Sequence, residues 1–198
     1  FTNENPDVIN WTAPAALNNV EFLVVGGGGG GGADNWQKAA TGGAGGGGGG
    51  VVTGLVNFAK NDNLFVSVGK GGDGGKIQVN NNGFGASYSG ADSTFGIDDV
   101  IYVTAYGGGR DQGSNDSSEG YSNGKVGGNG GSGAGSRPEV MEISSATQGT
   151  ANFVTCYKTF GNSGGKGSDD VYSNYGAGAS GGGGGAHPDP DLGKGGDA

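Results

Sequence analysis

The side chains that most often carry out covalent chemistry are rare in this sequence. It contains one cysteine, Cys156, and one histidine, His187. A nucleophilic Cys or Ser ordinarily needs a histidine base, and His187 stands in His-Pro-Asp-Pro-Asp, which is typical of a proline-stiffened loop. Cys156 lies among Phe153, Val154 and Tyr157, which indicates a small buried apolar residue. One Cys and one His also exclude a disulfide framework and a Cys/His zinc cluster.

Phosphate-binding and calcium-binding motifs are absent or weak. G-x-G-x-x-G recurs here through composition alone, and no Gly-Lys pair is followed by the Ser or Thr of a phosphate loop. Three stretches resemble a calcium-binding loop weakly: Asp189-Pro-Asp191-Leu-Gly193 and the two acid pairs Asp98-Asp99 and Asp169-Asp170. We therefore expect no catalytic residues, no cofactor and no bound metal, and a protein that is not an enzyme.

Aromatic residues inside polar loops are the remaining candidates for a binding site. Four of them stand in loops between glycine runs: Trp36, Tyr121, Tyr172 and Tyr175. Tyr and Trp on loops of a rigid scaffold are typical of protein or glycan recognition. The same rings could instead cover the end of the scaffold. The sequence leaves both interpretations open.

The composition excludes several classes of protein. The chain has 198 residues, of which 52 are Gly, and hydrophobic residues make up 32%. Its 19 acids outweigh 10 bases and give a net charge of −9, so nucleic acid is a poor partner. No apolar run approaches the roughly 18 residues of a membrane span. We expect a structural or adhesive protein, extracellular or on the surface of a virion, with no nucleic-acid partner and no insertion into a membrane.

Short apolar segments predict the strands that must position the loops. They are rich in β-branched and aromatic residues and bounded by Gly or polar residues. We predict strands over 8–12, 20–25, 51–58, 64–68, 100–106 and 152–158. No segment shows a sustained helical stripe of apolar residues, so we expect almost no α-helix. Residues 139–145 are the one stretch for which a helical turn is kept as an alternative.

Glycine runs alternate with these strands, and several of the runs carry one side chain at every third position. Lys70-Gly-Gly-Asp73-Gly-Gly-Lys76 is the clearest case. Three residues per turn is the period of the polyproline-II helix, whose backbone groups point outward and need neighbours. Only Gly lets such backbones touch. The period predicts a bundle of polyglycine-II helices, since the short runs and scarce Pro exclude collagen.

The pattern of interruptions predicts which runs lie inside the bundle. We expect the uninterrupted runs 26–32, 45–50 and 181–185 to be enclosed, and the interrupted ones to form its wet rim. The rim side chains would be Lys70, Asp73, Lys76, Val126, Asn129, Ser132, Ser163, Lys166, Lys194 and Asp197. A Cβ at Gly28 should then be more damaging than loss of the Asp73 side chain. Because such a bundle buries almost no apolar surface, we expect it to rest on an antiparallel β-sandwich.

A family resemblance agrees with this architecture. The pattern begins with Trp11-Thr12-Ala13-Pro14, followed by Val20-Glu21-Phe22-Leu23-Val24-Val25 and a glycine run. It continues in three later stretches: Phe65-Val66-Ser67-Val68-Gly69, Ser93-Thr94-Phe95-Gly96 and Val103-Thr104-Ala105-Tyr106-Gly107. From about Trp11 onward the chain resembles the glycine-rich domain of bacteriophage tail-fibre tips and related adhesins. The resemblance implies a β-sandwich joined to a polyglycine-II bundle, with receptor-contacting loops at one end. It carries no catalytic motif.

These observations predict one glycine-rich domain over residues 1–198, with strands and glycine runs interleaved over 20–198 and an N-terminal strand in 1–14 that links or exchanges with a neighbour. The leading hypothesis is a non-enzymatic scaffold whose loops bind a cell-surface receptor or glycan. The alternative is a pilus-like filament subunit that polymerises with its own copies by N-terminal strand addition. Ice binding is a weaker third hypothesis, because the rim carries mixed Lys, Asp, Asn and Ser. The chain begins at Phe1, so we expect a processed product or a segment of a longer polypeptide.

Overall fold

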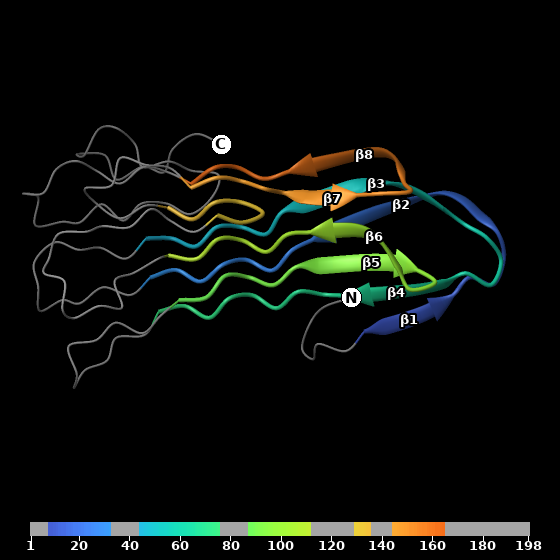
Figure 1. Ribbon diagram of the computed structural model, residues 1–198, viewed down its shortest axis with the longest axis horizontal. Helices are drawn as coiled ribbons and strands as arrows, with labels where there is room; N and C mark the ends of the chain where they lie inside the picture. Colours follow the sequence, from blue (N-terminus) through green and yellow to red (C-terminus); the bar gives the residue numbers. More distant parts are fainter. Residues whose placement is uncertain (1–7, 33–43, 76–86, 112–128, 136–143, 165–198) are drawn as a thin grey trace, which may run out of the picture.

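The computed structural model describes residues 8–32, 44–75, 87–111, 129–135 and 144–164, and within them the chain is all-β (Figure 1). These residues form two antiparallel sheets and contain no helix. The strands are β1 (Ile9–Thr12), β2 (Leu17–Val25), β3 (Val51–Phe58), β4 (Asn63–Ser67), β5 (Ser93–Ile97), β6 (Val100–Ala105), β7 (Gly149–Ala151) and β8 (Thr155–Phe160). The predicted fold class is confirmed in this respect.

The two sheets differ in size and pack face to face. The larger has the strand order β1-β4-β5-β6-β7 and the smaller has the order β2-β3-β8. Val52 of β3 and Val103 of β6 meet in the core and are fully buried, and the rings of Phe22 and Phe95 contact edge to face at 5.0 Å. The remaining core residues are Ala13, Val56, Phe58, Ile97 and Ala105. Burial of these apolar side chains stabilises the sandwich that the sequence predicted.

The predicted strands agree with the observed ones to within a few residues, but β5 and β7 were not predicted. β5 contains Gly96, which weakens any strand pattern, and a Cβ at Gly96 would overlap the ring of Phe65 on β4. The ring of Phe65 therefore occupies the place of the missing side chain. β7 has only three residues. Such short strands exist because their neighbours pair with them, and local sequence alone does not reveal this.

One of the acid pairs forms the turn between β5 and β6. Ile97 pairs with Val100, and Asp98 and Asp99 between them have φ angles of 47° and 66°. Two consecutive positive φ values are typical of the type I′ turn of a two-residue hairpin. The Asp98 carboxylate accepts a hydrogen bond from the Asn63 N–H at 3.2 Å. The pair is thus a tight turn tied to β4.

The glycine segments run side by side away from the sandwich and bond to one another through their backbones (Figure 1). Three N–H groups of segment 26–32 donate to segment 44–50: Gly26 to Gly50, Gly29 to Gly47 and Gly32 to Ala44, at 2.8 to 2.9 Å. Each donor lies three residues after the previous donor. This repeat equals the period of a polyproline-II helix, and it supports the polyglycine-II interpretation, which stays a prediction.

Segment 26–32 bonds to three further neighbours with the same period. Gly27 and Gly30 donate to the carbonyls of Ala91 and Tyr88. Their own carbonyls accept from Gly108 and Asp111, and the carbonyls of Gly28 and Gly31 accept from Gly72 and Gly75. The segment thus touches four others at backbone distance. Added side chains would push these neighbours apart.

The prediction of which runs are enclosed was wrong in part. A Cβ at Gly28 would meet only the Gly47 carbonyl oxygen at 3.8 Å, and one at Gly48 would meet only the Ser132 hydroxyl at 3.9 Å. The buried glycines of the layer include residues 107–109, which follow β6, an interior strand of the larger sheet. The segments that lie beside a run decide its enclosure, and not the absence of interrupting side chains. Segment 26–32 continues β2, an edge strand of the smaller sheet, and keeps one open side.

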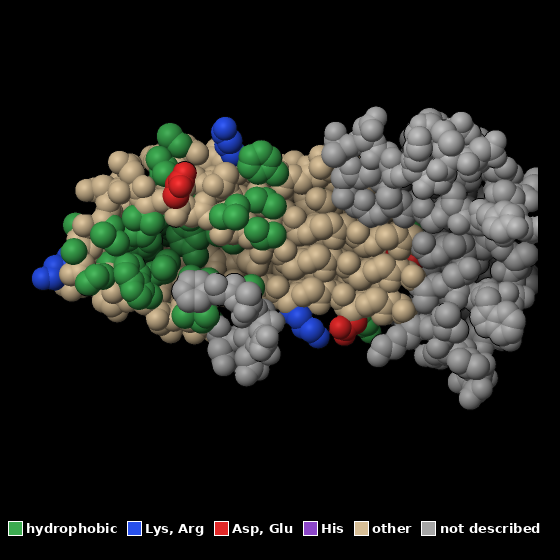
Figure 2. Space-filling view, turned by 180° about the vertical axis from the view of Figure 1, so that it is seen from behind, with side chains coloured by type: hydrophobic (Ala, Val, Ile, Leu, Met, Phe, Trp, Pro, Cys, Tyr) green, Lys and Arg blue, Asp and Glu red, His purple; other side chains and the backbone are tan. Residues whose placement is uncertain are grey.

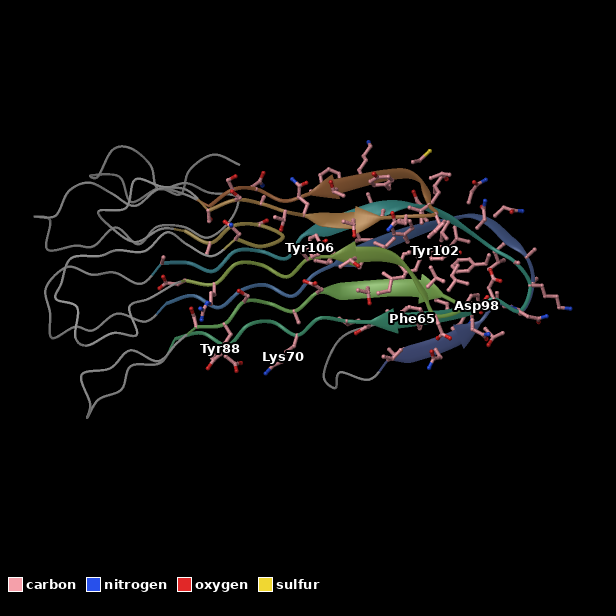
Figure 3. The ribbon with its side chains drawn as sticks, in the orientation of Figure 1. Phe65, Lys70, Tyr88, Asp98, Tyr102 and Tyr106 are labelled. Atoms are coloured by element: carbon pink, nitrogen blue, oxygen red, sulfur yellow. The ribbon has the colours of Figure 1, made fainter. Side chains whose placement is uncertain are left out.

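Of the predicted rim residues that the structure describes, Lys70, Asp73, Asn129 and Ser163 are exposed as predicted, and Ser132 is not. The other predicted rim residues lie outside the described residues: Lys76, Val126, Lys166, Lys194 and Asp197. Lys70 and Asp73 are exposed and form an ion pair at 3.5 Å, and Figure 3 shows Lys70 at the margin of the glycine layer. Ser132, however, is 7% exposed. It lies in the buried run 131–135, which other segments surround, so the threefold spacing there does not mark a wet edge.

The expectation for Cys156 was also wrong, because this residue is exposed. The pairing of β3 with β8 shifts register between Thr53 and Leu55, and Cys156 has a φ of 52°. A bulge of this kind redirects the side chains of its strand. It turns Cys156 away from the core that its apolar neighbours suggested.

Candidate functional site

The four aromatic candidates, Trp36, Tyr121, Tyr172 and Tyr175, lie outside the described residues, as does His187. The structure does describe the points where the chain leaves the glycine layer and where it re-enters it. These points include Gly32, Ala44, Asp111, Asn129 and Gly164. They lie at the end of the layer that is opposite the sandwich (Figure 1). We call this the distal end.

A first group of buried polar contacts joins three chain segments at the distal end. Asp111 is 1% exposed, and its carboxylate accepts from the Ala44 N–H at 3.4 Å. The Ser87 hydroxyl donates to the Asp111 carbonyl, and the Arg110 guanidinium donates to the Ser87 carbonyl at 3.0 Å. The contacts tie together the described ends that flank 33–43, 76–86 and 112–128. We call these four residues the Asp111 clasp.

A second group of contacts joins the neighbouring segments in the same way. The Ser144 hydroxyl donates to the Ala134 carbonyl, and the Ser144 carbonyl accepts from the Gly164 N–H at 3.1 Å. The Ser132 hydroxyl accepts from the Asn162 N–H at 3.2 Å. Ser144 is fully buried. This Ser144 clasp ties the described ends that flank 136–143 to the start of 165–198.

The clasps contain most of the buried polar side chains that the structure describes. Of five such residues, Ser87, Asp111, Ser132 and Ser144 belong to the clasps, and the fifth, Ser93, accepts from the Gly69 N–H at 2.8 Å near the sandwich. Buried polar groups of this kind are stable when paired, and they fix the backbone around them. At the distal end, the two clasps therefore hold the ends of several described segments close together.

Sequence reasoning missed the clasp residues. Their signal was nonetheless present, because Asp111 and Ser87 stand where a glycine segment meets a polar loop. Ser and Asp side chains readily bond to backbone groups at such ends. What the sequence could not show is that the partners, Ala44 for Asp111 and Asp111 for Ser87, come from other segments.

The described residues hold neither a cluster of metal ligands nor a helix of membrane-spanning length. No three His, Cys, Asp or Glu side chains among them gather as a metal site would require. Nor does the described part of the chain hold a helix long and apolar enough to cross a membrane.

An all-β sandwich continued by a hydrogen-bonded glycine layer, with clasped chain ends at its far edge, defines a glycine-rich scaffold. Comparison with protein families agrees: the glycine-rich domain family matches residues 3–198, and the chain belongs to that family. A comparison with curated proteins finds no match.

Proposed function

We propose that this protein is a non-enzymatic adhesive scaffold, extracellular or on a virion surface, that presents loops to a cell-surface receptor or glycan. The observation that supports it is that the ends of the described segments come together at the distal end. Segments 33–43, 76–86, 112–128 and 136–143 each leave and re-enter there, beside the start of 165–198. Three of these segments carry Trp36, Tyr121, Tyr172 and Tyr175.

The glycine layer explains how such loops would be held at a distance from the sandwich. Its backbones bond every three residues and its ends are clasped, so we propose that it is a polyglycine-II bundle that acts as a rigid spacer. A run of seven residues in that conformation spans about 22 Å. Loops that begin from fixed ends lose less conformational entropy on binding. The resemblance to tail-fibre tip adhesins agrees with this role.

Binding of the fluorescently labelled full chain to a glycan array and to a panel of intact bacterial cells tests the proposal. Replacing Trp36, Tyr121, Tyr172 and Tyr175 together with Ala should lower binding at least about tenfold, because aromatic anchors dominate such interfaces. Tyr88→Ala is the matched control. Tyr88 is 56% exposed on a glycine segment, where Figure 3 shows it at the margin of the layer. Unchanged binding by the fourfold variant, or an equal loss in the control, would refute the proposal.

One observation favours a second candidate, the filament subunit. β1 is an edge strand that pairs with β4 along only four residues, and three of those residues are exposed. In the structure it completes the sheet of its own chain, so polymerisation would exchange β1 between copies. Electron micrographs of the purified protein would then show long regular polymers, and deletion of residues 1–10 should abolish them. Polymers that persist without those residues would reject strand exchange.

A further inference from the structure

The outer face of the smaller sheet is apolar and uncovered in the described structure. Val52 points into the core, so the residues before and after it on β3, and their partners across the sheet, point outward. This outer face carries Glu21, Leu23 and Val25 of β2, Val51, Thr53 and Leu55 of β3, and Lys158 and Phe160 of β8. Leu23 is 68% exposed, Phe160 52% and Val25 47%. Figure 2 shows hydrophobic side chains gathered over the sandwich end.

The polar groups of this face leave its centre apolar. The Thr53 hydroxyl donates to the Phe22 carbonyl at 2.8 Å, so it needs no outside partner. The two charged residues, Glu21 and Lys158, lie on the outer strands, β2 and β8. They are about 10 Å apart across the sheet. The face thus has an apolar centre, an acid along one side and a base along the other.

The same face continues as bare backbone over the glycine layer. Gly28 and Gly31 extend the outward side of β2, and Gly48 extends that of β3. A Cβ at any of them would meet nothing closer than 3.4 Å, and the same is true at Gly71 and Gly74. Figure 2 shows few hydrophobic or charged side chains over this part of the layer. Exposed side chains flank these glycines at Lys70 and Asp73 on one side and at Asn162 and Ser163 on the other, so the bare part of the face is formed by segments 26–32 and 44–50.

The combined face is large enough for a specific interface. Three strands make the sheet part about 14 Å wide and about 20 Å long, and the two glycine segments add a part about 10 Å wide and about 22 Å long. Two copies in contact would bury about 1,000 Å² in total, at the lower end for a specific interface, as in a weak and reversible dimer. The sheet alone would supply only about half of that area.

We propose that this face binds a second copy of the chain, through a twofold axis parallel to the strands. Such an axis lays β2 of one copy over β8 of the other. Glu21 then lies one row, about 7 Å along the strand, from Lys158 of the second copy, within reach of the long lysine side chain, and the pair forms twice. A twofold axis across the strands would separate these charges. The charge pattern therefore selects the parallel arrangement, with the sheets about 10 Å apart.

The parallel arrangement places both distal ends at the same end of the dimer. This consequence rests on the proposed function, because it matters only if the loops bind. Two loop sets facing one surface would bind it together, with an avidity that exceeds the affinity of either set alone.

Sedimentation velocity of the full chain, without ligand and with a reductant that keeps Cys156 free, tests the dimer. At about 0.15 M salt, which screens the charge of −9 beyond about 8 Å, we expect a reversible monomer–dimer equilibrium. Leu23→Lys should weaken it more than tenfold. Glu21→Lys and Lys158→Glu should each weaken it about tenfold, and the double variant should restore the wild-type constant. Ile101→Lys, at a residue 51% exposed on the larger sheet, should change nothing.

Several outcomes would overturn this proposal. They are a wild-type chain that stays monomeric at every concentration, a dimer that folded Leu23→Lys leaves intact, and two weakened charge reversals that the double variant does not restore. Circular dichroism of each variant separates loss of the dimer from loss of the fold. Because no receptor or glycan is present, failure here leaves the adhesion measurement untouched, and failure there leaves the dimer untouched.

Discussion

Two adjacent glycines should respond in opposite ways to the same substitution. A Cβ at Gly29 would overlap the Gly109 carbonyl oxygen and lie 2.6 Å from the carbonyl carbon, whereas a Cβ at Gly28 meets one atom at 3.8 Å. Both residues lie in the same segment and have the same chemistry. Gly29→Ala should therefore destabilise the protein strongly, and Gly28→Ala should be neutral or slightly stabilising.

The structure gives the size of the effect. To restore a carbon–carbon contact of about 3.5 Å, segment 107–111 must move by about 0.9 Å. Among the hydrogen bonds that hold it, three join it to segments 26–32 and 44–50: Gly108 to Gly27 and Gly47 to Gly109, both at 2.8 Å, and Asp111 to Gly30 at 3.2 Å. Such a movement stretches them past the useful range. At about 0.5–1.5 kcal/mol each, their loss amounts to about 3 kcal/mol.

Thermal unfolding by circular dichroism measures the difference, at a concentration at which the protein sediments as a monomer. A loss of about 3 kcal/mol should lower the Tm of a chain of this size by about 6–12 °C. Gly28→Ala should leave it unchanged or raise it slightly, since Ala restricts the unfolded chain more than Gly does. Gly72→Ala and Gly71→Ala repeat the comparison, because a Cβ at Gly72 overlaps the Tyr88 carbonyl and one at Gly71 meets only an atom at 3.6 Å. Equal melting temperatures within both pairs would refute backbone contact as the basis of the layer.

Two further predictions concern the core and the distal end. Val52→Ala, at a residue with no exposed surface, should cost about 2 kcal/mol through lost burial and a cavity, which chemical denaturation measures as a lower midpoint at constant slope. Asp111→Ala should cost about 1–3 kcal/mol, because the Ala44 N–H loses its carboxylate partner in a buried site. Hydrogen exchange should show faster exchange at Ala44 and little change at Val103, and uniform acceleration of both would contradict a local role for the clasp.

The sequence predicted the sandwich because its strands carry their own signal. Val51-Val52-Thr53-Gly54-Leu55-Val56 is apolar, β-branched and bounded by a glycine run, and β3 forms there with the predicted bounds. β5 was not predicted although it forms a two-residue hairpin with β6, because Gly96 weakens its strand pattern. β7 escaped prediction because its pairing with β6 comes from a distant part of the chain.

The arrangement of the glycine runs could not be predicted in the same way. A glycine carries no side chain whose polarity distinguishes inside from outside, so Gly28 and Gly29 are identical in sequence and differ only in what lies beside them. The side of each run that is closed depends on which other segments bond to it. Segment 26–32 bonds to four other segments and still keeps one open side at Gly28, whereas residues 107–109 are buried among their neighbours.

This dependence links the two halves of the molecule. The sandwich sets the order of its strands through side-chain packing, and most described runs of the glycine layer continue one of these strands, although 129–135 does not. Within the layer, runs that continue strands of different sheets also bond to each other, as segment 26–32 after β2 does with the run that leads into β5. At the distal end, the Asp111 carboxylate bonds to Ala44, which is far away in sequence. The strands and the Cβ-free contacts between runs therefore fix where the described segments end, whatever sequence follows them, and this is what the proposed scaffold function requires.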